Sequence, residues 1–393
     1  MTSAQKKYSL RGEYMDFSAE NILRAAILHI PGIGSGRLRQ LLAFYGSAKT
    51  AWEDKNNSVP VLSETAWFLD FCQAREKIDP GKIALRLEEK AISLVSLGEE
   101  HYPFLLAECP DAPPLLFYKG VLEAGQEGIA VVGSRRATPY GKAAASYLAK
   151  NIVKNGYVVV SGLARGIDTA AHRGALEGNG VTWAFLAGGL DAVYPAENLP
   201  LAHSILENGG ALISEYPLSS PAEPGRFPAR NRLISGAARG VIVVEAAQKS
   251  GSLITVDFAL EQGREVFAVP GPIFSEQSKG THRLLKMGAK LATEAEDIFQ
   301  ELPPGSSSRL NRKLVSNSNL SRPLGKAEKD RGDKPIEKWQ EILACLSDLP
   351  LHIDRLTVMC PLSAQEIALG LLELQLAGKI IQMPGQHYVL NRC

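Results

Sequence analysis

The sequence predicts an α/β protein, in which a parallel sheet covered by helices lies between a helical N-terminal part and a small C-terminal domain. Two observations predict the sheet. From Gly128 onward, short apolar runs alternate with segments of helical periodicity. These runs are apolar at nearly every position, which is typical of parallel strands buried on both faces. A third observation, a polar stretch after Leu302, separates this core from a second helical region.

Residues 1–100 are expected to form an N-terminal helical domain. Apolar residues recur at helical spacing from Ala19 to Ala51, on both sides of a Pro-Gly-Ile-Gly turn. The segment Leu28–Leu42 has the form of a helix-hairpin-helix (SAM-like) unit. Its turn either offers backbone N–H groups to a phosphate beside Arg37 and Arg39, or serves in packing alone. The net charge of −3 over residues 1–127 favours packing, and both interpretations stay open.

Residues 101–302 are expected to form the sheet-containing core, which the chain enters through a proline-rich passage, Tyr102–Pro114. The predicted strands are Ile129–Ser134, Tyr157–Ser161, Val181–Ala187, Ala211–Glu215, Val241–Glu245 and Glu265–Val269. The predicted helices are Gly141–Asn155, Thr169–Glu177, Pro200–Glu207, Arg230–Ala238, Leu253–Gln262 and Gly280–Met287. Strands that alternate with helices in this way indicate βαβ units.

Two further segments complete the chain. Residues 303–335 are rich in Ser, Asn and Pro and carry a net charge of +5, which predicts a flexible basic linker. Residues 336–393 predict a winged-helix domain, with a helix over Ser363–Leu376 and a closing hairpin at Pro384-Gly385. The outward positions of that helix are Gln365, Glu366, Glu373 and Gln375. Because a helix that reads duplex DNA needs cations and amides there, we expect this domain to contact protein instead.

Composition narrows the class of protein. The net charge is +1 over 393 residues, so any anion site must be local. Five cysteines show no CxxC spacing, which fits reduced thiols inside the cell. The N-terminus has no apolar signal-peptide core, and no apolar run reaches 18 residues. We therefore expect a cytoplasmic protein with no membrane partner.

The first candidate site is the turn after the first core strand. Gly133 and Ser134 end that strand and lead toward a helix, which leaves backbone N–H groups at the carboxyl edge of the sheet. The turn is neither a GxGxxG dinucleotide fingerprint nor a P-loop. Arg135 and Arg136 follow directly. Cations at this edge favour an anionic ligand.

The next two strands end in less specific sequences. Arg165 lies between two glycines, and Asp168 is suited to cap the following helix, with His172 on the same helical face. A metal pair is the alternative, but no third ligand occurs at suitable spacing. After the third strand, Asp191 and Tyr194 either orient their loop or touch a ligand.

The most specific stretch combines arginines with an aromatic residue. Around Phe227 lie Arg226, Arg230, Asn231 and Arg232. Guanidinium groups bind phosphates, and an aromatic face stacks on a base, so the group suits single-stranded nucleic acid. The alternative is a core phenylalanine with solvated arginines.

A second Gly/Ser turn follows the fifth core strand, where the sequence Lys249-Ser250-Gly251-Ser252 begins a helix. Two Gly/Ser-rich helix N-termini and an arginine cluster are thereby expected at one edge of the sheet, an arrangement that binds phosphate. Catalytic signatures are not found: the chain has no GxSxG elbow and no HExxH motif. We expect a protein that is not an enzyme and that needs no metal or cofactor.

Eight of these segments resemble, in order, those of the DNA processing protein DprA (Smf) family, over roughly residues 100–295. They read VVGSRRATPYG, SGLARGIDTAAH, GGLDAVYP, SEYP, FPARNRLISG, VVEAAQKSGSLIT, GREVFAVPGP and GTHRLLKMGA. The resemblance implies an extended Rossmann-like core that binds single-stranded DNA without sequence preference. It also implies a homodimer through that core, protection of the strand, and loading of the RecA recombinase during natural transformation.

Carried over residue by residue, Gly133, Ser134 and Arg135 match the family's phosphate-binding turn. Phe227, Arg230, Asn231 and Arg232 match its Phe-Pro-x-Arg-Asn-Arg segment.

The chain departs from the family at two positions that many or some members fill with lysine. Ala196-Glu197 and Pro224 stand there, so Arg226 or Lys249 is expected to supply the missing charge. The core also resembles Rossmann-like nucleoside monophosphate hydrolases of the lysine-decarboxylase-like family. Those enzymes carry a Pro-Gly-Gly-x-Gly-Thr loop, whereas this chain has KSGSLITVDFALEQ without the paired glycines. The difference favours binding over hydrolysis.

Overall fold

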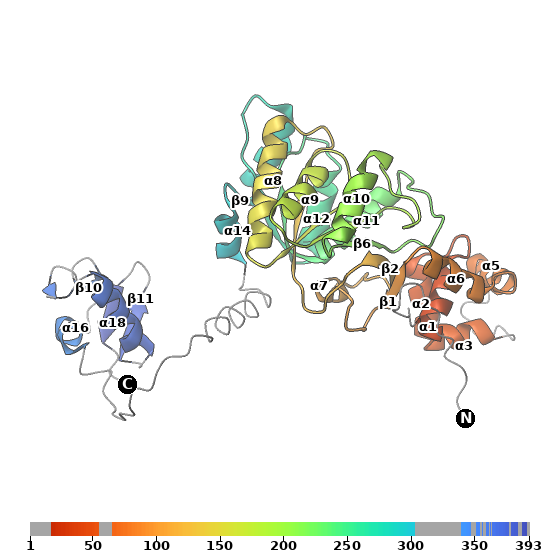
Figure 1. The fold of residues 1–393 in the computed structure, drawn as a ribbon, viewed down its shortest axis with the longest axis horizontal. Coiled ribbons are helices and arrows are strands. Elements are labelled where there is room, and N and C mark those ends of the chain that lie inside the picture. The colour runs from red at the N-terminus through yellow and green to blue at the C-terminus, as the bar shows by residue number, and fades with distance from the viewer. Residues whose placement is uncertain are drawn as a thin grey trace, which may run out of the picture. The chain divides into compact units, whose positions relative to one another are not determined.

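The computed structural model describes residues 17–54, 65–302, 339–346, 351–353, 356, 359–360, 362, 364–376, 379–383 and 387–390 (Figure 1). They belong to two compact units, residues 1–320 and 321–393, which are described separately. None of the described helices is both long and apolar enough to span a lipid bilayer.

The first unit contains a nine-stranded sheet with the order β1-β2-β6-β5-β4-β3-β7-β8-β9. All six predicted strands are present and run parallel. They are β3 (Gly128–Val132), β4 (Val158–Ser161), β5 (Thr182–Phe185), β6 (Ala211–Ser214), β7 (Ala238–Val243) and β8 (Glu265–Ala268). Every residue of β3, β4, β5 and β6 is buried, which explains their continuous apolar sequence.

Three outer strands of the sheet were not predicted. Two antiparallel strands, β1 (Ser93–Ser96) and β2 (Leu115–Gly120), extend the sheet beyond β6, and β9 (Lys290–Leu291) pairs with β8 at the other edge. β1 lies within the range expected for the N-terminal helical domain, yet it pairs with β2 along its length. None of the three is followed by a helix and a further parallel strand, the pattern that identified the others, so only the tertiary pairing reveals them.

Helices cover both faces of the sheet (Figure 1). Side chains alternate along β3: Ile129 and Val131 pack on one helical layer, and Ala130 and Val132 on the other. The first layer contains α8 (Pro139–Lys154), α9 (Ile167–Glu177), α10 (Leu199–Glu207) and α14 (Ala295–Glu301). The second contains α7 (Phe104–Ala107), α11 (Arg226–Gly236), α12 (Ser252–Glu261) and α13 (Lys279–Lys286). The six predicted helices are all present, but α11 begins four residues before its predicted start.

The N-terminal helices pack on the core and share one apolar cluster with it. They are α1 (Ala19–Leu28), α2 (Ser35–Tyr45), α3 (Ala48–Glu53), α5 (Ala66–Arg75) and α6 (Pro80–Glu89). The turn between α1 and α2 contains Gly32 at φ +81°, a conformation that favours glycine. The two arginines considered for phosphate contact both have partners within the protein. Arg37 donates to Gly32 O and lies over the Trp67 ring, and Arg39 donates to Ala112 O at 2.9 Å.

The second unit has the secondary structure expected of a winged helix. It contains α16 (Gln340–Cys345), β10 (Leu351–His352), α18 (Ala364–Leu376), β11 (Ile380–Met383) and β12 (His387–Leu390). The strands form an antiparallel sheet in the order β10-β12-β11. Glu373, expected on the exposed face of α18, is instead half-buried and accepts a 2.6 Å hydrogen bond from Trp339 Nε1. The predicted turn at Pro384-Gly385 and the linker 303–335 lie outside the described residues, as does the side chain of Gln365.

Candidate nucleic-acid interface

A cavity of about 670 Å³ lies at the carboxyl ends of β3 and β7. The chain runs outward from β3 through β4, β5 and β6 on one side, and through β7, β8 and β9 on the other. This reversal is the topological switch point, where open α/β sheets bind ligands. We call it the switch-point cavity. It is lined by Val132–Arg136, Ala164, Asp168, Tyr194, Ala222, Pro224, Phe227, Pro228, Arg230, Asn231, Ile234, Ala247, Ser250–Ser252, Ile254, Thr255 and Gln277.

The turn after β3 is held on both sides by backbone hydrogen bonds. Ser134 N donates to Glu245 O at 2.7 Å, and Ser134 O accepts from Ile167 N at 3.2 Å. The Ser134 hydroxyl accepts from Arg136 N at 3.0 Å. A Cβ on Gly133 would lie 2.7 Å from the Ile167 side chain and 2.8 Å from Glu245 O, so only glycine fits. These contacts fix the backbone of the turn that carries Arg135 and Arg136.

Arg135, Phe227 and Tyr194 form an aromatic–arginine stack at this cavity. The Arg135 guanidinium carbon lies 4.8 Å from the centre of the Phe227 ring. The Tyr194 ring meets the Phe227 ring edge-on, with centroids 5.7 Å apart. Phe227 is half-buried and belongs to none of the apolar clusters, so its ring remains partly accessible. In the described part of the chain, neither Arg135 nor Arg136 forms an ion pair.

The two helix N-termini expected at this edge differ. α12 begins at Ser252 with Gly251 as its N-cap, and its first turn holds no acidic residue. Ser250, Gly251 and Ser252 line the cavity. Ser252 N makes a long hydrogen bond of 3.4 Å to Ser250 Oγ, and the Ser250 and Ser252 hydroxyls lie 2.7 Å apart. Leu253 N donates to Ser250 O at 3.1 Å. The N-terminus of α8 is closed, because Thr138 caps it and donates its N–H and hydroxyl to the Glu245 carboxylate. The expectation of two open N-termini is therefore wrong for α8.

Arg230 forms part of the cavity wall and is 3% exposed. Its guanidinium donates to Gly162 O at 2.6 Å and also to Phe185 O. Asp168, in the same wall, accepts from Gly162 N at 3.1 Å and Ala164 N at 3.3 Å. Burial raises the pKa of Asp168, opposed chiefly by the charge of Arg230. Burial also lowers the pKa of Arg230, to about 10, which leaves it cationic at neutral pH. Asp168 thus braces the turn before α9, whereas the sequence suggested a cap of the helix itself.

Four of the expected DNA-binding residues lie outside the switch-point cavity. Arg165 makes a bidentate ion pair with Glu197, at 2.8 and 2.9 Å, beside the cavity. Arg232 pairs with Glu215 at 2.6 Å and with Asp111 at 3.2 Å. Arg226 stacks on the Tyr216 ring in a different cavity, described below. Lys249 is exposed next to Ser250. Lys249 is therefore better placed than Arg226 to supply the charge that Pro224 lacks.

The remaining polar residues considered from the sequence have structural partners. Asp191 accepts from Ser219 N at 2.9 Å and orients its loop. The buried His172 pairs with Thr182 Oγ1 at 2.7 Å, which confirms packing. No cluster of three potential metal ligands occurs in the described residues. Thr255 and Gln277 also line the cavity. They were missed because a single polar residue in a helix or loop carries no pattern.

The cavity combines three kinds of group. Arg135 and Arg136 supply uncompensated positive charge, the N-terminus of α12 supplies backbone N–H groups, and Phe227 supplies an aromatic face. Asp168 is the one carboxylate among the described lining residues, and its Oδ2 accepts from the backbone amides of Gly162 and Ala164. Such a site suits an anion that carries a planar ring.

Comparison with known proteins agrees with this architecture. Residues 93–303 match the family model of DNA recombination-mediator protein A, and residues 331–386 match that of the DprA winged helix domain. Protein Smf of Escherichia coli is 42% identical over 307 residues, covering 78% of this chain and 79% of that protein. The DNA processing protein DprA of Bacillus subtilis is 44% identical over 224 residues, 56% of this chain and 75% of that protein.

Among solved structures, the DNA processing protein A of Streptococcus pneumoniae superposes with a TM-score of 0.62 and 36% identity. The match covers 72% of this chain and 98% of that one. Because one family model spans more than half of the chain and a relative of 42% identity is covered over most of its length, this chain belongs to the DNA processing protein DprA (Smf) family.

Proposed function

We propose that the protein binds single-stranded DNA without sequence preference, in the switch-point cavity. The observation that carries the proposal is the aromatic–arginine stack beside the open N-terminus of α12. Arginines and backbone N–H groups contact phosphates, which are the same at every nucleotide. A partly accessible ring stacks on any base, because every base has a π face. Stacking on Phe227 requires a base that is not already paired within a duplex.

The test is a titration of oligo-dT against the wild-type protein and the variants Arg135→Ala and Phe227→Ala. Phe227→Ala is expected to weaken binding by about 1–3 kcal/mol, the usual contribution of one stacked base. Arg135→Ala is expected to lower the slope of log affinity against log salt concentration by about 0.7, the loss of one phosphate contact. Arg173→Ala serves as the charge-matched control, since Arg173 is exposed on α9 outside the cavity.

Two results would contradict this placement of the site. One is an unchanged salt slope for Arg135→Ala, equal to that of Arg173→Ala. The other is a loss of thermal stability in Phe227→Ala without any loss of affinity in the folded fraction, which would assign the ring to packing. Thermal unfolding of each variant separates these cases.

The competing hydrolase hypothesis needs a carboxylate free to act on a nucleotide. Near this edge the candidates are Asp168, Asp191, Glu215 and Glu245. Asp168 accepts from a backbone amide, and Asp191 accepts from Ser219 N. Glu215 accepts from Arg232, and Glu245 accepts from Thr138. We therefore infer a binding protein and do not adopt hydrolysis as a second function. Assaying release of free base from nucleoside monophosphates tests that choice directly.

On the family resemblance, we further propose that the bound strand is protected and then loaded with the RecA recombinase during natural transformation. The cytoplasmic location expected from the lack of CxxC spacing among the cysteines is part of this proposal. The winged-helix domain is assigned a protein contact because Glu366 and Gln375, two of its outward residues, are exposed and carry no positive charge.

A homodimer through the core is proposed at the β9 edge. Three apolar side chains are exposed there: Leu260 (60%), Met287 (67%) and Leu291 (51%). Leu260 and Met287 line a groove of about 320 Å³ that also holds Asp257 on α12 and Arg283 on α13. In a two-fold dimer the same patch meets itself, so the carboxylate of one copy can pair with the cation of the other. Pairing would also cover the outer edge of β9.

Light scattering during size exclusion tests this dimer. The wild-type protein is expected to elute at twice the chain mass, and the double variant Leu260→Glu, Met287→Glu at the mass of one chain, because it buries two carboxylates at the interface. Leu199→Glu, at an exposed apolar position on α10, is the matched control and should remain a dimer. A wild-type monomer at tens of micromolar would rule the proposal out.

A further inference from the structure

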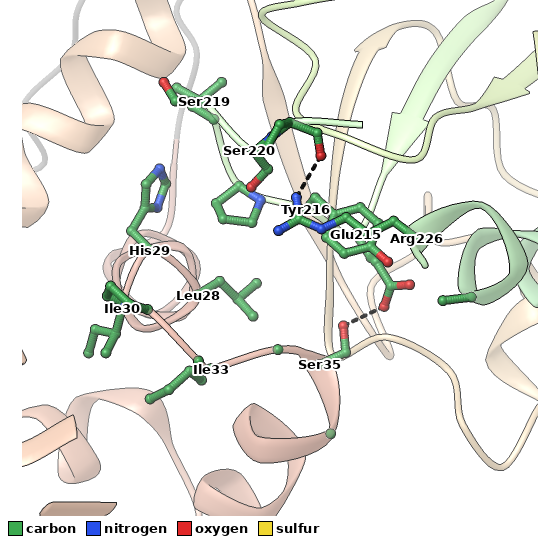
Figure 2. A pocket seen from close by; sticks show the side chains of 18 of the residues that line it. Leu28, His29, Ile30, Ile33, Ser35, Glu215, Tyr216, Ser219, Ser220 and Arg226 are labelled. Atoms are coloured by element: carbon green, nitrogen blue, oxygen red, sulfur yellow. Dashed lines mark hydrogen bonds between the residues drawn. The ribbon is translucent and has the colours of Figure 1, made fainter. Parts of the chain in front are cut away.

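A second cavity, of about 570 Å³, lies between the hairpin joining α1 to α2 and the loop after β6 (Figure 2). We call it the hairpin cavity. One wall consists of Leu28–Gly36. The other is formed by Glu215–Pro221, Arg226, Ala229 and Arg232. None of the contacts attributed above to the switch-point cavity lies in it.

One helix forms a wall of both cavities. At its N-terminal end, α11 turns Phe227, Asn231 and Ile234 toward the switch-point cavity. It turns Arg226, Ala229 and Arg232 toward the hairpin cavity. These two sets follow the helical period, in which residues three and four apart share a face. A ligand that passes over the N-terminus of α11 would therefore leave one cavity and enter the other.

The hairpin cavity contains a second pairing of arginine with an aromatic ring. The Arg226 guanidinium carbon lies 4.8 Å from the centre of the Tyr216 ring, the same distance as between Arg135 and Phe227. Arg226 is held by Pro221 O at 2.9 Å and by Glu223 at 3.4 Å, and Figure 2 shows its guanidinium beside Tyr216. Tyr216 is half-buried. The cavity thus repeats the combination of charge and ring that marks the first site.

The wall formed by Leu28–Gly36 offers hydrogen-bond donors to the cavity. α2 begins at Ser35 with Gly34 as its N-cap, so no side chain caps its first turn, and that turn holds no acidic residue. Ser35 Oγ donates to Glu215 at 2.7 Å, and Arg232 pairs with the same carboxylate, so the acid in this cavity is compensated (Figure 2). His29 Nδ1 lies 2.7 Å from Ala25 O, and its buried Nε2 has no hydrogen-bond partner among the described residues.

We propose that the hairpin cavity is a second subsite for the same single DNA strand, which crosses α11 after leaving the switch-point cavity. A base stacks at Tyr216 and Arg226, and a phosphate approaches the first turn of α2. The inference rests on the proposed function of the switch-point cavity and makes the proposed DNA-binding site longer. A strand fits better than an apolar peptide, because arginine, ring and helix N-terminus recur here in the combination found in the first cavity.

The experiment compares oligo-dT of about 4 and about 16 nucleotides, the usual range of single-strand site sizes. The long oligonucleotide can reach both cavities, whereas the short one occupies the first. Gly36→Asp adds a negative charge to the first turn of α2, where a Cβ meets nothing within 4 Å. A carboxylate there favours the helix, so folding should be unharmed, but it repels phosphate. Ala66→Asp adds the same charge at the first residue of α5, outside the cavity, as the matched control.

Gly36→Asp and Tyr216→Ala are each expected to weaken binding of the long oligonucleotide by about tenfold and to leave the short one unchanged. Tyr216→Phe keeps the ring and should restore wild-type affinity. Thermal unfolding of each variant confirms that it is folded. In addition, an oligonucleotide carrying 5-iodouracil should cross-link to Tyr216 only when it is long.

The outcomes separate this inference from the function on which it rests. Variants that bind both lengths like the wild type overturn the second subsite and leave the first in place; the cavity would then serve another class of ligand. Equal losses for both lengths in folded variants also overturn it, since the two cavities would not be separable. Failure of the wild-type protein to bind either oligonucleotide would remove the proposed function itself, before any variant is compared.

Discussion

Replacing Arg230 by alanine is expected to lower the free energy of unfolding by about 3–5 kcal/mol. The guanidinium is buried and donates to Gly162 O and Phe185 O, so alanine leaves both carbonyls without these donors. It also removes the cation that most strongly stabilises the ionised form of the buried Asp168. Urea unfolding followed by circular dichroism measures the change.

The matched control is the double variant Arg230→Met, Asp168→Asn. Because it removes both charges together, it should be less destabilised than Arg230→Ala. The family motif suggested instead that Arg230 contacts DNA. If Arg230→Ala kept wild-type stability and lost affinity for oligo-dT, that role would be correct and the structural one wrong.

Gly166→Ala is expected to lower the free energy of unfolding by about 3 kcal/mol or more. It should also reduce the affinity of the folded fraction for DNA. Gly166 lies at φ +80° and ψ −119°, a region that is essentially restricted to glycine. A Cβ there would press against Ser134 O and lie 2.9 Å from the carbonyl of Arg135. Backbone atoms cannot rotate away as a side chain can, so the turn that presents Arg135 and Arg136 has to move. Unfolding and oligo-dT titration measure the two effects.

Gly209→Ala provides the comparison for this prediction. Gly209 also has a positive φ, +75°, but a Cβ there meets nothing within 4 Å. Its replacement should therefore cost only the conformational penalty, about 1–2 kcal/mol, with DNA binding unchanged. Equal costs at the two positions would mean that Gly166 is required for its dihedral angles alone and does not brace the turn after β3.

The six central strands, their parallel direction and the edge that holds the candidate ligand site could all be predicted from the sequence. Near-continuous apolar strands separated by helices are compatible with few architectures other than a parallel sheet covered on both faces. In such a sheet, ligand sites are expected at the carboxyl ends of the strands. Gly133, Arg135 and Ser250 could be assigned to that edge because each lies at, or within a few residues of, the carboxyl end of a predicted strand. The three outer strands β1, β2 and β9 were not predicted, since they lie outside the alternation of strand and helix and are recognised only by their pairing in the fold.

Which cavity each arginine lines could not be predicted from the sequence and follows from the tertiary fold. The sequence placed the start of α11 at Arg230, but the helix begins at Arg226, with Pro228 in its first turn, where a missing N–H costs little. Because the helix begins four residues earlier, all the residues from Arg226 to Arg232 follow the helical period. It directs Phe227 and Asn231 to one cavity, and Arg226 and Arg232 to the other.

Burial and ion pairing are likewise decided by segments distant in sequence. Arg230 meets carbonyls of Gly162 and Phe185, and Arg232 meets Glu215 and Asp111. The N-terminus of α8 is filled by Glu245, which lies more than 100 residues away in sequence. A charge in a linear sequence is recognisable, but whether it is free to bind a ligand depends on partners that only folding brings to it.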